Sequence, residues 1–424
     1  MTEKQLTFDS RNHQLTNINI WTADSHWLVY DVRPDAATFS GLTVERVNLH
    51  GQTEIIYQVR DGAHVGVITA SPDLPPRYVC IHGPEHPDNQ WKYDFHHRRG
   101  VIIQNGLAEN LDACDITPPF TPGALRGGSH VHVFSPDGMR LSFTYNDHVM
   151  HEFAAKEDLR NVGIAVPLHP VCSPKRHPRE YDGSHFCVLV SRTTSSPQPG
   201  SDDINRAYEE GWIGKEGYLK SNGHRQRWAL AFIGDTLSIN GEKVPEVFIV
   251  DLPETMSDYA QAGDDPIEGT VSSLPAPPKG IMQRRLTFTH HRAYPGLVTS
   301  PRHWLRSSPG GQSIAFLMKD DVGVVQLWVI APTGGQPRQV SHVASDIQSA
   351  FSWHPDGRSV ALINDNSVML CDMANGEMRR LTARTAEPPL ADAVVCSPDG
   401  QYVAYLRRVK GFQQIFIANV TSPQ

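Results

Sequence analysis

An apolar run, a Ser/His-Pro-(Asp/Gly)-Gly turn and a second apolar run recur along almost the whole chain. Proline presets φ in such a turn, the Asp side chain bonds to the local backbone, and glycine tolerates a positive φ. The flanking runs are rich in the β-branched and aromatic residues that favour strands. Each copy therefore predicts a β-hairpin. Clear copies occupy residues 131–145, 304–318, 350–363 and 393–406, and weaker copies occupy residues 18–31 and 65–81.

Two shorter patterns extend the hairpin to four strands. A third apolar run follows it, as in residues 325–331, and a phrase such as Arg-Arg-Leu-Thr comes next, as in residues 379–383. A repeat of four short strands is the content of one β-propeller blade, and the clear turn prolines recur about every 45 residues, which is one blade length. The pattern predicts a ring of seven blades, with six or eight as alternatives.

The fourth blade is the least regular. The gap between Pro136 and Pro309 is too long for one blade, so it must hold a degenerate blade with insertions. We expect the strands of that blade at residues 184–192, 228–235, 246–253 and 284–288.

The two ends of the chain complement each other. The last repeat has three strands and lacks the Leu-Thr strand, while residues 5–9 read QLTFD and provide one. A propeller closed by an N-terminal strand has no exposed sheet edge. We therefore expect residues 1–424 to form one all-β propeller domain.

One insertion, at residues 195–222, is polar and rich in proline and glycine. Ser201, Asp202 and Asp203 precede INRAYEEGW, an order typical of a capped helix. The segment is therefore predicted to contain a short helix. It is either a surface elaboration or a lid over one mouth of the ring.

Net charge and hydropathy exclude some functions. A formal charge of −8 argues against a general surface for nucleic acid or anionic membranes. No apolar run is long enough for a membrane span, and the first residues lack the apolar core of a secretory signal. We expect a cytoplasmic protein whose partner is a small ligand. The oligomeric state is left open.

Histidines gather where blades begin. His130 and His132 stand two residues apart at the start of a first strand, where a period of two places them on one side. His303 occupies the same repeat position as His130, and His64 and Gln348 enter two other blades. Converging imidazoles are typical ligands of Zn, Mn, Ni or Fe. The alternative is a wet polar funnel without a metal.

Other polar residues lie near the same mouth. Arg126 and Arg302 are placed to hold a carboxylate or phosphate, or else form surface salt bridges, and His185 enters the fourth blade. Of the two remaining histidine-rich clusters, residues 94–100 read as a solvated loop. Residues 146–151 read as second-layer or surface positions. Nucleotide-binding and hydrolase motifs are missing from the sequence.

The chain resembles two groups of propellers. The repeated Ser-Pro-Asp-Gly phrase resembles TolB-type propellers. The phrases RNHQLTNINIWT, YDFHHRRGVI, LRGGSHVHVFSPDG, FTYNDHVMHE, PGSDDINRAYEEGW and RRLTFTHHRAYPGL resemble those of the enterobacterial YidR family from end to end. This resemblance implies the propeller fold and transfers no activity.

A more distant resemblance is to the oligogalacturonate lyases. These are seven-bladed propellers that hold a divalent metal, typically manganese, with histidines and a glutamine, and they cleave uronides by β-elimination. The resemblance implies a Mn or Zn site at His130, His132, His303, His64 and Gln348, with Arg126, His185 and Arg302 as catalytic residues. The offset of His-x-His from its turn departs from that family. The expected function is a metal-dependent lyase of an acidic sugar or oligosaccharide; the alternative is a scaffold that binds a protein or small ligand at its funnel without catalysis.

Overall fold

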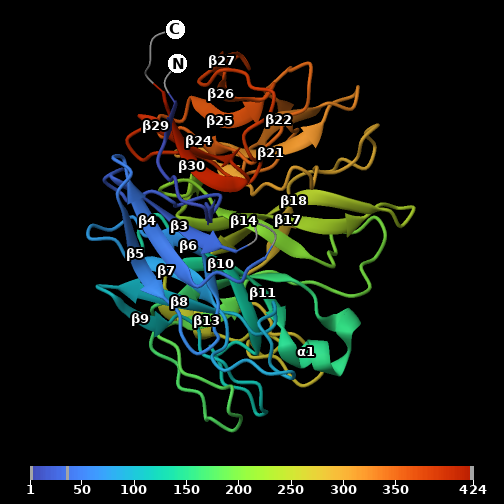
Figure 1. Ribbon diagram of the computed structural model, residues 1–424. Coiled ribbons are helices and arrows are strands. Elements are labelled where there is room, and N and C mark those ends of the chain that lie inside the picture. The colour runs from blue at the N-terminus through green and yellow to red at the C-terminus, as the bar shows by residue number, and fades with distance from the viewer. Residues whose placement is uncertain (1–2, 35–37, 421–424) are drawn as a thin grey trace.

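The computed structural model describes residues 3–34 and 38–420, and these form seven four-stranded antiparallel sheets arranged as the blades of a propeller (Figure 1). The described residues contain little helix: α1 (His148–Phe153) is accompanied by two 3₁₀ turns, η1 (Ala155–Glu157) and η2 (Met256–Ala260). The predicted all-β architecture with seven blades is confirmed. No helix in the described part of the chain is both long enough and apolar enough to cross a membrane.

The first three blades follow the chain order without interruption. Blade 1 consists of β2 (Asn12–Gln14), β3 (Trp27–Arg33), β4 (Thr43–Asn48) and β5 (Thr53–Gln58). Blade 2 consists of β6 (Val65–Ala70), β7 (Tyr78–His82), β8 (Arg99–Gln104) and β9 (Leu107–Asn110). Blade 3 consists of β10 (Gly127–Phe134), β11 (Leu141–Asp147), β12 (Asn161–Val166) and β13 (Phe186–Leu189).

The next three blades differ mainly in strand length. Blade 4 consists of β14 (Ala207–Trp212), β17 (Trp228–Leu237), β18 (Lys243–Leu252) and β19 (Gln283–Arg285), and β15 (Tyr218–Leu219) pairs separately with β16 (Arg225–Gln226). Blade 5 consists of β20 (Arg306–Ser307), β21 (Ile314–Lys319), β22 (Val325–Ile330) and β23 (Arg338–Gln339). Blade 6 consists of β24 (Ser352–Trp353), β25 (Ser359–Asn364), β26 (Ser367–Asp372) and β27 (Met378–Arg380).

The seventh blade combines strands from both ends of the chain. It consists of β28 (Val394–Cys396), β29 (Tyr402–Val409), β30 (Phe412–Asn419) and β1 (Glu3–Gln5). β1 lies antiparallel to β30, with Glu3 opposite Ala418 and Gln5 opposite Phe416. The next residue, Leu6, is fully buried and donates its backbone N–H to the carbonyl of Ile415 at 2.8 Å.

The hairpin turns have the chemistry expected from the repeat. In the turn between β10 and β11, the Ser135 hydroxyl donates to the Asp137 carboxylate at 2.5 Å and accepts from the backbone N–H of Arg140 at 2.9 Å. Gly138 has φ +71°, a conformation that costs glycine little. The same turns in several blades line one end of the ring.

Two expectations about blade 4 are wrong. Residues 195–222 contain no helix; the part expected to be helical is β14, the first strand of the blade. Its residues Ala207–Gly211 are all buried, as in a strand covered on both faces, whereas a surface helix would expose one side. Ser201 and Asp203 bond within a turn instead of capping a helix. Residues 184–192 belong to blade 3, because β13 pairs with β12.

Candidate functional site

A cavity of about 790 Å³ lies at one end of the propeller axis. We call it the axial cavity. It is lined by first-strand residues of several blades, among them Gln14, Val67 and His130, and by the loops that precede first strands. A second cavity of about 630 Å³ lies at the other end of the same strands, where the hairpin turns meet. The second cavity is lined by turn prolines and by Trp21, Trp212 and Trp353.

The wall of the axial cavity is rich in positive charge. Six Arg and Lys residues line it: Arg33, Arg98, Arg160, Arg206, Lys243 and Arg302. Three of them are neutralised by carboxylates, because Arg33 pairs with Asp31 at 2.6 Å, Lys243 with Asp235 at 2.6 Å and Arg302 with Glu209 at 2.7 Å.

The other three arginines form no ion pair with any described residue. Arg98 packs its guanidinium over the rings of Phe39 and Tyr93, and Arg206 packs over Tyr208. Arg160 donates one hydrogen bond to the Thr144 hydroxyl at 2.7 Å. Burial lowers the pKa of Arg160 to about 10, but the group is still positively charged at neutral pH. Unpaired guanidiniums around a cavity favour an anionic ligand.

His130 is the titratable side chain that stands out in this wall. It is 2% exposed, and within residues 3–34 and 38–420 neither ring nitrogen has a hydrogen-bond partner. Burial, reinforced by the positive charges of Arg160 and Arg98, lowers the pKa of His130 well below its usual value. The imidazole is therefore neutral at pH 7, with one nitrogen able to accept a proton. A buried polar group without a hydrogen-bond partner costs free energy, so its presence indicates a role in catalysis or in binding a ligand.

A β-bulge separates His130 from His132. The pairing of β10 with β11 shifts between His130 and Val133, and Val131 between the histidines has φ +53°. This left-handed conformation breaks the alternation of side chains, so the prediction that both imidazoles share one side is wrong. His132 instead packs against Gly100 of blade 2, its Nε2 lies 2.9 Å from the Ser129 hydroxyl, and burial lowers its pKa to about 3.

The remaining predicted metal ligands do not reach the cavity wall. His303 Nε2 accepts a hydrogen bond from the backbone N–H of Leu317 at 3.1 Å, and burial lowers its pKa to about 4. Gln348 bonds through its side-chain amide to Asn366, at 3.1 and 2.9 Å. His64 packs against the Tyr93 ring, with ring centroids 5.2 Å apart. The donor atoms of His303 and Gln348 are already used in hydrogen bonds within blades 5 and 6, and neither residue lines the axial cavity, so the predicted set does not fit a metal ion.

The three predicted catalytic residues are scattered. Arg126 is fully buried, and it donates to Asp147 at 2.7 Å and to the carbonyls of Thr270 and Ser273. It joins blade 3 to a connecting loop and lines neither the axial cavity nor the second cavity. His185 bonds to the Ser184 hydroxyl at 3.0 Å, and burial lowers its pKa to about 4. Of the three, Arg302 is the one that lines the axial cavity.

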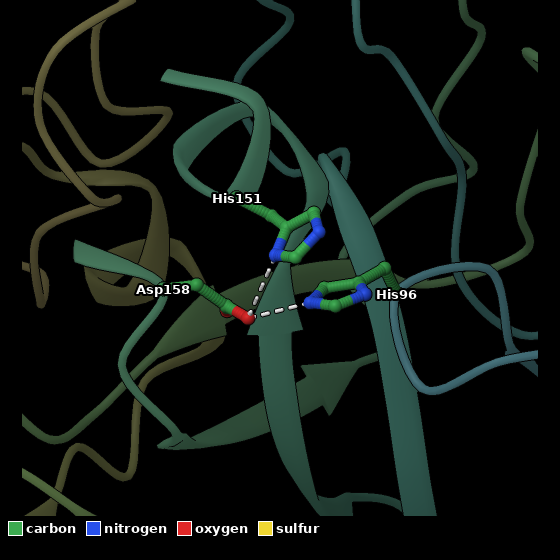
Figure 2. Close-up of side chains that lie close together, drawn as sticks. All are labelled: His96, His151 and Asp158. Carbon is green, nitrogen blue, oxygen red and sulfur yellow. Dashed lines mark hydrogen bonds and ion pairs between the residues drawn. The ribbon is translucent and has the colours of Figure 1, made fainter. Parts of the chain in front are cut away.

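Sequence reasoning missed the one group in the described residues whose donor atoms are close enough to hold a metal ion. His96, His151 and Asp158 place one ligand atom each within 4.8 Å of one another (Figure 2). We call this group the rim cluster, since Asp158 lines the axial cavity and His96 lines a smaller neighbouring cavity of about 320 Å³. The available signal was the two histidine-rich segments at residues 94–100 and 146–151, which belong to neighbouring blades.

The rim cluster is held by strong local contacts. His96 Nε2 lies 2.5 Å from Asp158 Oδ2, and His151 Nδ1 lies 3.7 Å from the same oxygen. Burial lowers the pKa of His96, but its bonds to Asp158 and Asp94 outweigh burial and raise the pKa to about 9. Beside the cluster, the Trp91 ring stacks on the His97 ring, with ring centroids 3.7 Å apart.

Comparisons with known proteins agree with the fold. Among solved structures, an oligogalacturonate lyase in complex with manganese has a TM-score of 0.57 at 11% identity, covering 98% of this chain and 92% of that chain. An oligogalacturonate lyase from Vibrio parahaemolyticus has a TM-score of 0.54 at 11% identity, with 99% and 94% covered. The β-propeller domain of the Trilobed protease from Pyrococcus furiosus has a TM-score of 0.52 at 10% identity, with 98% and 97% covered. At these identities the likeness concerns the fold alone.

Sequence comparison is more specific. Residues 64–181 match the model of a family described as a protein of unknown function, DUF3748. The uncharacterized protein YidR of Escherichia coli (strain K12) is 61% identical over 404 residues, which cover 95% of this chain and 94% of that protein. With identity and coverage at this level, the chain belongs to the YidR family.

Proposed function

We propose that the axial cavity binds an acidic sugar or short acidic oligosaccharide and that the protein cleaves it by β-elimination. The observation that carries the proposal is that a neutral imidazole and positively charged guanidiniums lie together in the wall of the axial cavity. A neutral, unpartnered imidazole at His130 lies among the guanidiniums of Arg98 and Arg160, which have no carboxylate partner in the described chain.

Substrate binding depends on the arginines. A cavity of about 790 Å³ is within the size range of small-molecule sites. A uronide carboxylate offers two oxygens in a plane, which matches the fork of N–H donors on a guanidinium. Arg98 and Arg160 line the cavity, so they are available to a ligand carboxylate.

The chemical step needs a base beside the bound carboxylate. His130 takes the proton from the carbon that bears the carboxylate, and the C–H electron pair forms a carbon–carbon double bond. The bond from the adjacent carbon to the glycosidic oxygen breaks, the departing oxygen takes up a proton from solvent, and His130 then releases its proton to solvent. The arginines stabilise the negative charge that builds on the carboxylate. A bound carboxylate also offsets the charges that lower the pKa of His130, which strengthens the base.

The choice of substrate class follows the names of two structural neighbours. Two solved propellers of similar fold are named oligogalacturonate lyases, but their identity to this chain is 11%. The proposal therefore rests on the cavity wall. No step runs through a metal ion at the predicted set, because His303 and Gln348 are already hydrogen-bonded within the fold.

The test measures binding and reaction separately. Calorimetry with digalacturonate and trigalacturonate should give saturable binding that Arg160→Met weakens at least about tenfold, the loss expected for one carboxylate contact. His130→Gln should keep the binding and abolish the ultraviolet absorbance of the unsaturated product. His290→Ala, at an exposed histidine outside the cavity, is the matched control and should change neither.

The outcomes separate the two candidate functions. Binding without an unsaturated product would reject the lyase and support a scaffold that holds a small acidic ligand at its funnel. A wild-type protein that binds neither uronide would reject the substrate class.

A further inference from the structure

The rim cluster brings three donor atoms from two blades to one point. His96 lies in the connection between β7 and β8 of blade 2, His151 lies on α1, and Asp158 precedes β12 of blade 3. Figure 2 shows one nitrogen of each imidazole directed at the same oxygen of Asp158. The ring centroids of His96 and His151 are 4.1 Å apart. Two imidazoles and one carboxylate oxygen form a ligand set used by divalent transition metals.

The spacing of the donors is close to what such an ion requires. In a tetrahedral site, bonds of about 2.0–2.2 Å place neighbouring donor atoms roughly 3.3–3.6 Å apart. His96 Nε2 lies 2.5 Å from Asp158 Oδ2, which is below that range, and His151 Nδ1 lies 3.7 Å from the same oxygen, which is just above it. A shift of under about 1 Å in each side chain suffices. The His151 side chain is free to shift by this distance, because it is 42% exposed and lies on a short helix.

A second layer of contacts orients two of the three donors. Asp158 Oδ1 accepts hydrogen bonds from the Asn146 amide and the Asp147 backbone N–H, both at 3.2 Å, which leaves Oδ2 for the imidazoles. Asp94 Oδ1 lies 3.6 Å from His96 Nδ1, on the side of the ring away from Asp158. A carboxylate behind a histidine is the usual outer partner of a metal-binding imidazole, since it sets the tautomer and the ring orientation.

The helix that carries His151 is anchored independently of the cluster. Asp147 caps α1 by accepting the backbone N–H of Met150 at 2.8 Å, and the same carboxylate pairs with the buried Arg126. The position of His151 is therefore set by the framework of blade 3. A metal ion would add a cross-link between blades 2 and 3.

We propose that the rim cluster is a binding site for one divalent transition metal ion, held by His96, His151 and Asp158, with at least one coordination position open. Three protein ligands leave a position for water or for an external ligand. Because Asp158 and Asn146 both line the axial cavity, the open position lies at the rim of that cavity. The metal site does not depend on the proposed function, since its evidence is the donor geometry alone.

The competing account needs no metal. A proton on His96 would satisfy the Asp158 carboxylate as a simple ion pair, with His151 as a surface residue beside it. The two accounts differ in stoichiometry and in the role of His151. An ion pair binds no metal and gains little from an exposed third partner, whereas a metal site loses a ligand when His151 is removed.

The experiment uses the full chain after treatment with a chelator. Calorimetric titration with Zn²⁺ should show one ion per chain. Titration with Co²⁺ should produce visible absorption bands that Zn²⁺ removes by competition. His151→Ala should weaken Zn²⁺ binding at least tenfold, within the range found for lost metal contacts. Asp158→Asn should do the same.

A matched control addresses adventitious binding. His290 and His291 form an exposed pair on another part of the surface, with ring centroids 5.6 Å apart. The variant His290→Ala/His291→Ala should keep the wild-type Zn²⁺ affinity. Binding that His151→Ala leaves intact, binding that the control variant removes, or an absence of saturable binding would each overturn the proposal. Failure of uronide binding with an intact metal site would reject only the proposed function.

Discussion

Arg126 and Arg302 carry the same charged group in opposite environments. The side chains of Arg126 and its partner Asp147 are both fully buried, whereas 54% of the Arg302 side chain is exposed beside Glu209. A buried ion pair contributes little net stability, but the loss of one partner leaves an uncompensated charge inside the protein. The Arg302–Glu209 pair is exposed on the arginine side alone, since the Glu209 side chain is 7% exposed, so solvent screens this pair more than the Arg126 pair.

Arg126→Ala should therefore destabilise the protein by about 3–5 kcal/mol, the usual cost of leaving a buried charge unpaired. Arg302→Ala should cost less, about 1–2 kcal/mol, because water can reach the Glu209 carboxylate where the exposed guanidinium was. Urea unfolding at neutral pH measures both. Equal effects of the two substitutions would contradict the structural role assigned to Arg126.

Glu210 is a second buried group whose charge is poorly satisfied. It is 1% exposed; its Oε1 accepts one bond from Ser142 at 3.2 Å, and Oε2 has no partner in the described residues. Burial, aided by the charge of Glu209, raises the pKa of Glu210 from 4.5 to about 7. Between those two values the folded protein holds a proton that the unfolded chain releases. Stability therefore falls as pH rises from about 4.5 to about 7, and the loss persists above pH 7.

Glu210→Gln should remove this pH dependence and raise the free energy of unfolding at pH 8 by roughly 1–3 kcal/mol. Unfolding at several pH values between 5 and 8 is the measurement. Glu216→Gln, at an exposed position of the same blade, is the control and should follow the wild-type profile. A Glu210→Gln profile parallel to that of the wild type would show that this carboxyl titrates normally.

Secondary-structure elements could be predicted from the sequence where they are stabilised by contacts between neighbouring residues. The hairpin turns were predictable because Ser135, Asp137 and Gly138 make the turn with their own side chains and backbone. β14 was misinterpreted because a first strand has neighbours on both faces, so its Glu209-Glu210 pair reads as the polar side of a helix.

The candidate site was harder to predict than the fold. The direction of His132 depends on a positive φ at Val131, and no local pattern signals a β-branched residue in that conformation. The rim cluster depends on a loop of blade 2 packing against α1 of blade 3. His96 and His151 meet only through that tertiary contact. Sequence spacing carries no information about it.

The N-terminal strand offers a test at the scale of elements. β1 covers the outer side of β30, and Leu6 beside it is buried with Ile415 and Ile417. A chain that starts at Thr7 should expose β30 as an edge strand, so we expect a lower melting temperature and concentration-dependent self-association. Thermal unfolding and gel filtration measure the two effects.

Leu6→Ala in the full-length chain separates the two causes. It removes the buried side chain, at a cost of about 2–5 kcal/mol, but keeps the strand in place. This variant should melt early and stay in the wild-type association state. A truncated chain with unchanged melting temperature and elution would show that β1 is dispensable.

At the scale of the whole molecule, charge is distributed unevenly. The chain has a formal net charge of −8, yet the axial cavity is lined by six Arg and Lys residues against three Asp residues. Opposite signs on the body and in the cavity imply that an anion is repelled by most of the surface and attracted at one place. Field focusing by a low-dielectric cavity strengthens that local attraction.

Ionic strength therefore tests the cavity as an anion site. Salt shortens the screening length from about 10 Å at 0.1 M to about 3 Å at 1 M, so binding that depends on unpaired arginines should weaken. We expect the Kd of digalacturonate to rise severalfold between about 0.05 and 0.5 M NaCl, measured by calorimetry. The methyl ester of the same disaccharide has no carboxylate charge, so its weaker binding should not change with salt. If acid and ester bind alike at every salt concentration, the charge of Arg98, Arg160 and Arg206 plays no part in recognition, and the ligand of the axial cavity is not an acidic sugar.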